Sequence, residues 1–579
     1  MRAAWESPRD GPRLEGRMRA SAGSRIMKTV RYAMARGRAT VRLLMEKGPV
    51  RVRFWFIALA IGIAAGFAAV AFRKGIEWLQ AALYGTDDIL HLHSFAETLP
   101  WYWILLIPVF GGLAVGVILN RFTTDGRVRS VADVIEGAAL KDGRVETKAG
   151  IASALASLVT LSSGGSTGRE GPVVHIAGLI SSWVSNRIDA DGITGRDLLG
   201  CAVAAAVSAS FNAPIAGALF ALEVVLRHFA LHAFAPIVIA SVAGTVINRL
   251  EYGDVTEFTL IEEGALAFYV ELPAFLLLGL VSGLVAVAVM RAVFWTEDRG
   301  NDFVRWTRLP GILRPAVAGL LLGALAIFYP HIIGVGYETT SAALTGALAL
   351  REAIVFAVMK TVALAITVAG RMGGGVFSPS LMLGALTGLA FGHIATGIFP
   401  EVSGSETLYA LAGMGAVAAS VLGAPISTTL IVFELTGDWQ TGLAVMAAVS
   451  ISSAVSSQFV ARSFFLTQLL RRNVHLAAGP QAYLLSMFRV SRVMRPADDE
   501  RMASEARCWE LIEQGVYIDA NATLETAMPI FDRAGVAFLP VVTLTGEGNA
   551  PELRGALFHV DALKAYNRAL AATAAEEHS

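Results

Sequence analysis

The sequence contains few charged residues and almost no cysteine. Only 16% of its 579 residues are Asp, Glu, Lys or Arg, whereas soluble domains carry about 25%. The two cysteines, Cys201 and Cys508, are far apart, which excludes a disulfide framework and a cysteine metal site. The formal net charge is zero, so no overall charge indicates a nucleic-acid partner. With 55% hydrophobic residues and a mean hydropathy of +0.58, the chain is predicted to be an integral membrane protein.

Positive charge is concentrated at the N-terminus. Up to Arg53 there are fourteen Lys or Arg residues against four Asp or Glu. The positive-inside rule therefore predicts a basic cytoplasmic segment over residues 1–50. No compact apolar core with a small-residue cleavage site is present there, so no signal peptide is predicted. Met18 and Met27 are alternative starting residues.

The hydrophobic segments predict an all-α polytopic membrane domain over residues 51–472, followed by a soluble tail over 473–579. Segments 54–72, 101–119 and 272–293 are long enough to span a bilayer. Several apolar segments follow the second of these, many of them too short or too interrupted for simple spans: 151–161, 173–184, 198–208, 215–226 and 234–247. This pattern predicts broken and tilted helices.

Two parts of the chain repeat each other. Ala-Pro-Ile at 213–215 is followed by Glu223, and Ala-Pro-Ile at 424–426 by Glu434, each glutamate nine residues after its proline. We expect these two glutamates to satisfy helix ends or buried polar partners rather than to relay protons. The repeats are predicted at about 51–250 and 265–472.

A glycine-rich loop ending in proline precedes this motif in each half, at 164–172 and 373–379. Such interrupted segments in corresponding positions indicate a binding site near the membrane midplane. Irregular backbone at that depth must be buried in protein or line a wet cavity. The helix N-termini that follow the loops favour an anion. Because Glu170 is itself an anion on the first loop, the sequence predicts an anion pathway with a titratable plug.

These motifs together resemble the CLC family of chloride channels and chloride/proton antiporters. The resemblance is carried by Gly-Arg-Glu-Gly-Pro at 168–172, Gly-Val-Phe-Ser-Pro at 375–379, Asn-Ala-Pro at 212–214 and Gly-Ala-Pro at 423–425, and it covers about 51–472. It implies a homodimer with one pore per subunit, a CLC-like inverted repeat in each subunit, and chloride bound at helix N-termini. No cofactor is implied.

On this resemblance Glu170 is the gate. The implied chloride-binding positions are Ser130, Arg169, Gly171, Gly375, Val376, Phe377 and Phe465. The sequence departs from the family pattern at three places. Around Ser130, only this serine is retained of the family's Gly-Ser-Gly-Ile-Pro motif. Phe465 replaces the pore tyrosine and lacks its hydroxyl. Val224 replaces the inner proton-transfer glutamate of the antiporters, and a valine cannot carry protons.

We therefore predict a passive, glutamate-gated channel for chloride and other small monovalent anions in a bacterial inner membrane, with both termini cytoplasmic. The alternative is a chloride/proton antiporter with an unusual or weakened proton path. A membrane enzyme is not predicted, because no Ser/His or paired-Asp arrangement accompanies the Ser/Gly-rich segment 162–167. A cation-coupled solute carrier with broken helices shares the repeat pattern and is a third hypothesis.

For His175 and for the tail, the sequence favours a structural role over ligand binding. His175 is expected to be a hydrogen-bonded histidine of the helical bundle rather than a metal ligand. The tail is similar to a CBS domain, with a second unit near 516–561 and a first unit, 493–515, that is too short. We predict a degenerate CBS-like module that mediates dimerisation or docking rather than sensing an adenine nucleotide.

Overall fold

The computed structural model describes most of the chain beyond the basic N-terminus. The described residues are 50–85, 91–229, 231–253, 258, 268–401, 403, 405–474, 476, 485, 488–499, 501–543 and 552–577. The predicted cytoplasmic segment 1–50 therefore lies outside the described residues except for Val50.

Helices build the region up to residue 471. The first half contains α2 (Val50–Tyr84), α3 (Leu92–Ala96), α4 (Trp101–Phe122), α5 (Val131–Leu140), α6 (Thr147–Ser162), α7 (Glu170–Arg187), α8 (Gly192–Phe211), α9 (Pro214–Phe220), the π-helix η2 (Ala221–Leu226) and α10 (Leu231–Tyr252). The second half contains α11 (Phe268–Thr307), the 3-10 helix η3 (Gly311–Leu313), α12 (Arg314–Phe328), η4 (Pro330–Ile332), α13 (Tyr337–Leu344), α14 (Leu350–Ala369), α15 (Phe377–Ile398), α16 (Glu406–Leu422), α17 (Pro425–Thr436), α18 (Trp439–Phe459) and α19 (Phe464–Arg471).

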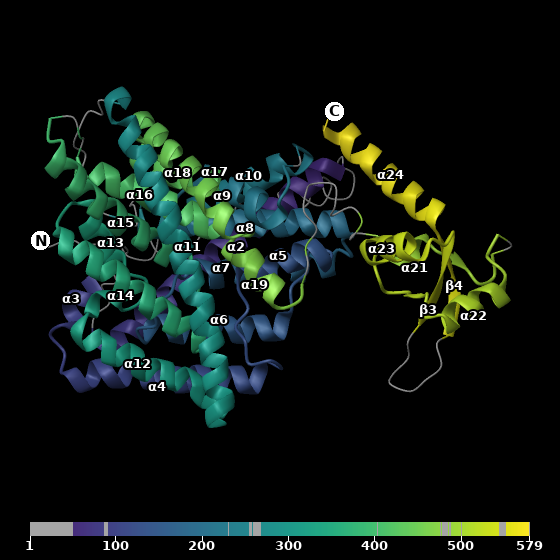
Figure 1. The fold of residues 1–579 in the computed structure, drawn as a ribbon, viewed down its shortest axis with the longest axis horizontal. Coiled ribbons are helices and arrows are strands. Elements are labelled where there is room, and N and C mark those ends of the chain that lie inside the picture. The colour runs from purple at the N-terminus through teal and green to yellow at the C-terminus, as the bar shows by residue number, and fades with distance from the viewer. Residues whose placement is uncertain are drawn as a thin grey trace, which may run out of the picture. The chain divides into compact units, whose positions relative to one another are not determined.

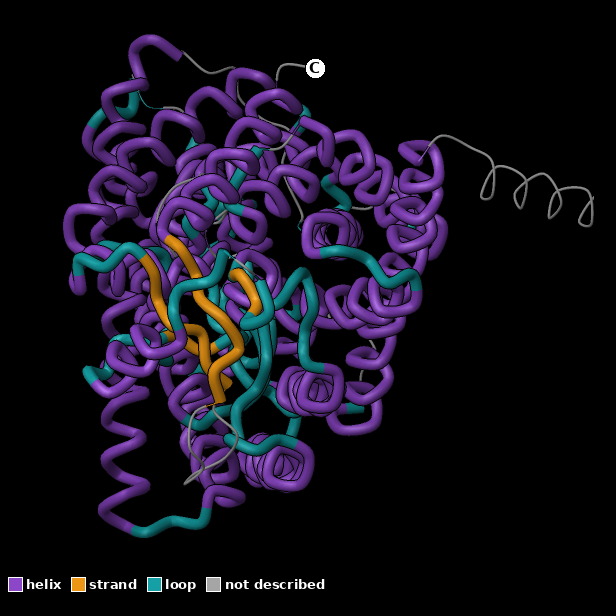
Figure 2. The backbone as a smooth tube through the Cα atoms, turned by 90° about the vertical axis from the view of Figure 1, so that its right-hand side faces the viewer, coloured by secondary structure: helices purple, strands orange, loops and turns teal. Residues whose placement is uncertain are grey.

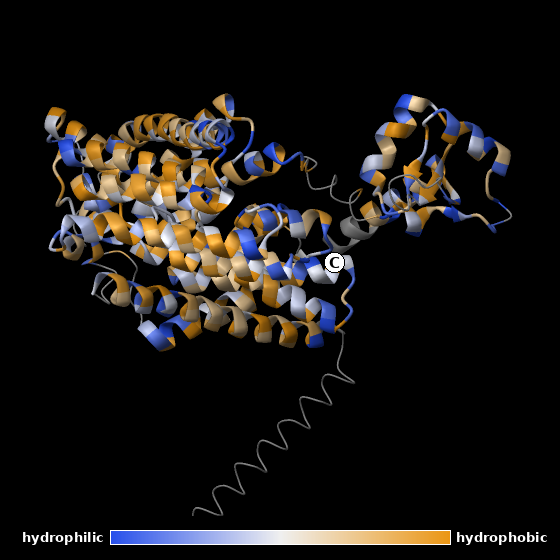
Figure 3. Ribbon diagram, turned by 90° about the horizontal axis from the view of Figure 1, so that it is seen from below, coloured by the Kyte–Doolittle hydropathy of each residue, from blue (hydrophilic) through white to orange (hydrophobic). Residues whose placement is uncertain are grey.

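Among the described residues, eight helices are long and apolar enough to cross a membrane. Figure 3 shows hydrophobic residues along most of the helical region. Large apolar side chains remain exposed on these helices, as at Trp101 (62%) and Leu277 (60%). Lipid is the natural solvent for such an exterior, because large exposed apolar patches are rare on soluble monomers. The predicted fold class, an all-α polytopic membrane protein with a small α/β tail, is confirmed.

The helix α11 is much longer than the predicted span 272–293. It continues through a charged segment, 297–305, as far as Thr307. Hydropathy reports where a helix leaves the apolar layer, not where its backbone hydrogen bonding ends. The carboxyl end of α11 is therefore a polar extension that the apolar pattern could not predict.

Glycine allows two of these helices to pack closely. Figure 1 shows α4 and α12 side by side, and their residues are in extensive contact. A Cβ atom at Gly112 of α4 would lie 2.2 Å from the carbonyl oxygen of Pro315 in α12. A Cβ atom at Gly116 would lie 1.9 Å from the carbonyl oxygen of Ile312 in η3, just before α12. A Cβ at Gly319 would lie 2.0 Å from the carbonyl oxygen of Pro108. Small residues at a helix interface in this way favour van der Waals packing in a membrane.

The two halves repeat the same local design. The helix α8 ends at Asn212 and α16 at Gly423, both with left-handed backbone (φ 56° and 70°). The next helix in each half begins with a proline, Pro214 in α9 and Pro425 in α17, where the missing N–H has no consequence. The helices α9 and α17 pack against each other, so the repeated motifs meet in space.

The tail forms a small sheet, which Figure 2 shows in orange. The strands β1 (Arg495–Pro496), β2 (Ile518–Asp519), β3 (Phe538–Thr543) and β4 (Glu552–Phe558) lie in the order β1-β4-β3-β2, with α21 (Val490–Val493), α22 (Glu505–Glu513), α23 (Leu524–Ala534) and α24 (His559–Glu577) around them. The strands β3 and β4 are antiparallel, whereas β2 and β3 are parallel. Leu524 and Phe531 of α23 are buried in one core with Leu539 and Leu557 of the sheet. The similarity to a CBS domain stays a prediction.

Candidate functional site

The two glycine-rich loops are joined by hydrogen bonds. The amide of Gly168 donates to the carbonyl oxygen of Gly375 at 2.7 Å, and the amide of Gly375 donates to the carbonyl oxygen of Gly168 at the same distance. Gly374 adopts φ 130°, and a Cβ there would lie 1.5 Å from Oγ1 of Thr167. A side chain at this position would push the loops apart, so glycine is required for their contact.

A helix begins directly after each loop, so two helix N-termini converge. The helix α7 begins at Glu170 and α15 at Phe377. The ring of Phe377 packs against those of Phe211 and Phe220, with centroids 4.7 and 5.5 Å apart. The N–H groups of a first helical turn have no acceptor within their own helix. They present partial positive charge to whatever lies between the two helices.

The carboxylate of Glu170 lies at the start of the opposite helix. One oxygen, Oε1, accepts a hydrogen bond from the hydroxyl of Ser378 at 2.5 Å, and Oε2 accepts one from the Ser378 amide at 3.4 Å. The side chain is only 1% exposed. A buried carboxylate held by donors in the first turn of α15 occupies a position that suits a small anion.

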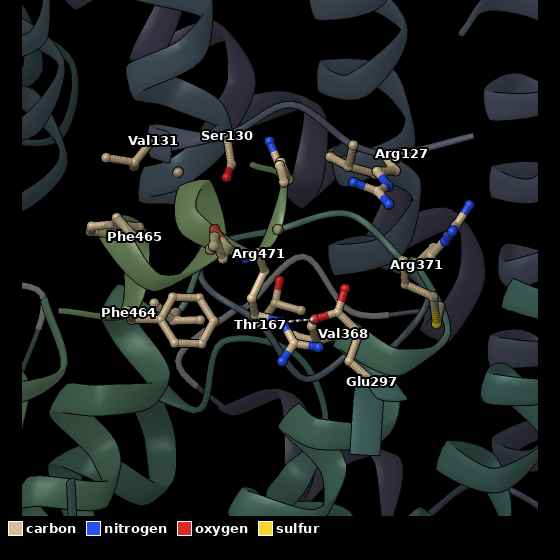
Figure 4. A pocket seen from close by; sticks show the side chains of 18 of the residues that line it. Arg127, Ser130, Val131, Thr167, Glu297, Val368, Arg371, Phe464, Phe465 and Arg471 are labelled. Atoms are coloured by element: carbon tan, nitrogen blue, oxygen red, sulfur yellow. Dashed lines mark ion pairs between the residues drawn. The ribbon is translucent and has the colours of Figure 1, made fainter. Parts of the chain in front are cut away.

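Beside this contact lies a cavity of about 420 Å³. Six of the predicted chloride-binding residues line it: Ser130, Gly171, Gly375, Val376, Phe377 and Phe465. Figure 4 shows Ser130 and Phe465 on the same side of the cavity, with the Ser130 hydroxyl pointing inward. Ser130 and Phe465, which are 335 positions apart in the sequence, therefore line one cavity.

Two predicted residues lie elsewhere. The guanidinium of Arg169 is buried against the carbonyl oxygen of Ser210, with Nη2 at 3.2 Å, and over the ring of Tyr337 at 5.2 Å. Its side chain does not line the cavity. Val224 is buried in the π-helix η2 and also does not line the cavity.

Ser130 is held at the start of α5 by Asp133, the residue that stands at the proline position of the family motif. Its amide donates to the Asp133 carboxylate at 2.8 Å, so Asp133 caps the helix start. Asp133 also pairs with Arg472, directly after α19, at 3.0 Å. This link ties the Ser130 loop to the helix that carries Phe465, and it stabilises the local geometry without the glycines and proline of the family motif.

The cavity wall is rich in arginine, which the sequence analysis did not identify. Arg127, Arg371, Arg471 and Arg472 line the cavity together with Glu297 and Asp298 (Figure 4). Both carboxylates pair with Arg471, and the Arg472 charge is met by Asp133. Within the described ranges, neither Arg127 nor Arg371 forms an ion pair. Excess positive charge in a cavity raises the local concentration of anions.

Glu223 and Glu434 each cap the start of a helix in the other half of the repeat. The Glu223 carboxylate accepts hydrogen bonds from the amides of Ile426 and Ser427 at 2.9 and 2.8 Å, at the start of α17. The Glu434 carboxylate accepts the amides of Ile215 and Ala216 at 2.9 and 2.7 Å, at the start of α9. The prediction that these glutamates satisfy helix ends is confirmed.

His175 is buried, with its side chain 1% exposed. A Cβ at Gly150 would lie 2.6 Å from Nε2, so the neighbouring helix α6 packs directly against the ring. The backbone of Ser130 acts on the ring as a hydrogen-bonding group. That His175 is a hydrogen-bonded histidine of the bundle stays a prediction.

Residues 111–457 match the sequence model of the voltage gated chloride channel family. The chain is 31% identical to the putative chloride channel protein ClcB-like of Ralstonia nicotianae, over 72% of this chain and 96% of that protein. It is 32% identical to the chloride channel protein CLC-f of Arabidopsis thaliana, over 72% of this chain and 55% of that protein.

Solved structures share the fold. A slow cyanobacterial Cl⁻/H⁺ antiporter superposes with a TM-score of 0.64 at 20% identity, covering 73% of this chain and 98% of that chain. A eukaryotic CLC transporter superposes with a TM-score of 0.61 at 18% identity, covering 88% of this chain and 98% of that chain. At these identities the similarity establishes a common architecture.

Proposed function

Because the chain belongs to the voltage-gated chloride channel (CLC) family, we propose that it transports chloride across a membrane between the loops 164–172 and 373–379. One observation carries this proposal: the Glu170 carboxylate lies against the first turn of α15, bonded to Ser378. A carboxylate and a halide are both compact anions, so a position that accepts one suits the other. Partial charges of oriented peptide groups would hold the ion weakly enough for it to leave.

Glu170 would act as the gate. While its carboxylate is seated at the start of α15, it occupies the anion position and closes the path. A proton would neutralise the carboxylate and so weaken its attraction to the helix N-terminus. An arriving chloride would instead compete with the carboxylate for the same donors. The side chain then swings away and the anion passes. Ser130 and Phe465 would line the route from the cavity, where Arg127 and Arg371 concentrate anions.

Passive conduction is the favoured mode. Coupled antiport requires a proton path to Glu170 from the side of the cavity, and Val224 provides no titratable group. The neighbouring Glu223 is engaged by the amides of Ile426 and Ser427 and by the Ser427 hydroxyl. These bonds hold its carboxylate at the start of α17, which makes it a poor substitute.

The alternative is chloride/proton antiport, since one protein of the same fold is described as a Cl⁻/H⁺ antiporter. Purified protein in liposomes distinguishes the two modes. A passive channel releases chloride down its gradient and takes up no protons against theirs. Uphill proton uptake driven by a chloride gradient would establish the antiporter instead, and vesicles that release no chloride would contradict both.

The surroundings of the transporter are part of the proposal. A bacterial inner membrane with both termini cytoplasmic is supported by the basic N-terminal segment. A homodimer is supported by exposed apolar residues at equivalent positions of the repeats, Ile215 at 52% and Ile426 at 45%. Cross-linking in native membranes tests the dimer, and protease access to the tail in inverted vesicles tests the orientation.

A further inference from the structure

A second cavity, of about 300 Å³, lies between the end of α4 and the start of α12. Its lining residues are Gly116, Leu119, Asn120, Thr123, Thr124, Asp125, Gly126, Val304, Gly311, Arg314, Pro315 and Arg371. Arg371 also lines the first cavity, of about 420 Å³ beside the two loops. The two cavities are therefore neighbours, with the Arg371 side chain in the lining of both. The proposed transport path makes no use of the second cavity.

Arg314 is the unusual group in this cavity. Its side chain is 7% exposed. Its Nε donates to the carbonyl oxygen of Ala369 at 2.7 Å, and its Nη1 donates to Oδ1 of Asn301 at 2.8 Å. Within the described ranges, the third nitrogen, Nη2, has no hydrogen-bond partner. Among the described residues no carboxylate forms an ion pair with Arg314. A buried cation without a compensating anion is costly.

The nearby acidic groups are already paired with other arginines. Asp125 lines the cavity and pairs with Arg129 at 2.8 Å. Glu297 of α11 pairs with Arg471 at 3.9 Å. Neither carboxylate is therefore available to neutralise Arg314, so the compensating charge must come from outside this set.

Other features of the cavity also favour an anion. Arg314 and Pro315 form the first turn of α12, a helix of 15 residues whose dipole has its positive end here. Arg371 adds a second guanidinium, bonded through Nη1 to the carbonyl oxygen of Asp125 at 3.0 Å. The hydroxyl of Thr124 is a further donor in the lining. Together they form a basic pocket at a helix N-terminus.

We propose that this cavity binds a phosphoryl group. A cavity of about 300 Å³ has room for a polyatomic anion, not only for a halide. Guanidinium forks match phosphate geometry. The residues Leu119 to Gly126 around the end of α4 contribute to the lining. Basic pockets at the cytoplasmic end of membrane helices suit lipid headgroups, and a soluble phosphate offers the same chemistry.

Gly311 provides a mild way to test this proposal. It lines the cavity, and a Cβ at this position would meet no atom within 4 Å. Gly311→Glu places a carboxylate in the cavity without a clash, and Gly311→Gln adds the same bulk without charge. Gly397, on α15, also has open space around it and does not line the cavity. Gly397→Glu therefore controls for the added charge alone.

The measurement is the thermal unfolding midpoint of the full chain in neutral detergent, at fixed chloride concentration and ionic strength. Titrants are inorganic phosphate, dioctanoyl phosphatidylglycerol and dioctanoylglycerol, which lacks the phosphate. A ligand that binds only the folded state raises the midpoint with concentration. We expect a phosphate-bearing titrant to raise it for the wild type. Gly311→Glu should weaken the apparent affinity by about tenfold or more, which is 1.4 kcal/mol, while Gly311→Gln and Gly397→Glu leave it within about threefold.

A response to phosphatidylglycerol alone assigns the site to a lipid headgroup, and a response to inorganic phosphate shows that the phosphoryl group suffices. The proposal is overturned if neither titrant acts, if dioctanoylglycerol acts as strongly as phosphatidylglycerol, or if Gly311→Glu and Gly311→Gln respond alike. These outcomes are independent of chloride flux, so failure here leaves the transport proposal untouched.

Discussion

Glu170 of α7 and Ser378 of α15 meet across the two halves of the repeat, hydroxyl to carboxylate at 2.5 Å. One side chain from the first loop thereby closes the first helical turn after the second loop. In the proposed gating, this bond would stabilise the seated carboxylate, and its strength would set how often the path is open.

Ser378→Ala should raise resting chloride efflux. The substitution removes a hydrogen bond to a charged group, worth about 1.5–3 kcal/mol, from the closed state only. The open fraction should then rise by about tenfold or more, measured as efflux from liposomes at neutral pH. Ser380→Ala is the matched control, because the Ser380 hydroxyl bonds to the carbonyl oxygen of Val376 within its own helix. Equal efflux from the two variants would remove Ser378 from the gate.

Glu223→Gln and Glu434→Gln should lower stability by similar amounts. Each carboxylate accepts two backbone amides at the start of a helix of the other half, and losing one charged hydrogen bond costs about 1.5–3 kcal/mol. The unfolding midpoint in detergent should fall for both variants. Glu513→Gln, on an exposed position of the tail helix α22, should leave it unchanged. A Glu223→Gln variant of wild-type stability would show that this carboxylate is not a structural cap.

Phe465→Tyr should slow anion exit and sharpen selectivity. A phenol hydroxyl added to the cavity wall near Ser130 provides a hydrogen-bond donor to the passing ion. We expect efflux slower by a few-fold, and a higher ratio of chloride to thiocyanate flux. Phe459→Tyr, on the exposed end of α18, adds the same hydroxyl away from the cavity. The prediction fails if the two variants have the same flux ratio.

Glu338 should make stability depend on pH below neutrality. Burial opposes its ionisation, but hydrogen bonds from His93 and Ser94 outweigh burial and lower the pKa of this carboxyl to about 2 from its ordinary 4.5. A carboxyl with a lowered pKa in the folded state contributes stability above pH 4.5, and that contribution is lost as the pH falls toward 2. The difference in unfolding midpoint between wild type and Glu338→Gln should therefore be largest at pH 7 and shrink at pH 3. A difference that is constant with pH would contradict this assignment.

The position of the two loops could be predicted because glycine and proline restrict the backbone directly. Residues 164–172 and 373–379 cannot continue a helix, and their apolar flanks keep them at membrane depth, so a contact between them is the natural solution. The equal spacing from Pro214 to Glu223 and from Pro425 to Glu434 predicted equivalent positions. Reciprocal capping requires the two halves to face each other, which no local pattern specifies.

Other features depend on tertiary contacts. Asp133 stands where the family motif has its proline. Its cap on Ser130 is local, three residues along the chain, but its pairing with Arg472, directly after α19, joins distant parts of the chain. The arginines of the cavity beside the loops come from separate loops and helix ends, and each is an ordinary basic residue in the sequence.

The most direct test of the account is chloride efflux from liposomes containing Glu170→Gln, measured between pH 4 and pH 8 beside the wild type and the exposed control Glu97→Gln. Glutamine fills the same volume without the charge that holds the gate at α15. The account predicts wild-type and control efflux that rises as pH falls, and Glu170→Gln efflux that is high at every pH. A Glu170→Gln variant with the same pH dependence as the wild type would contradict it.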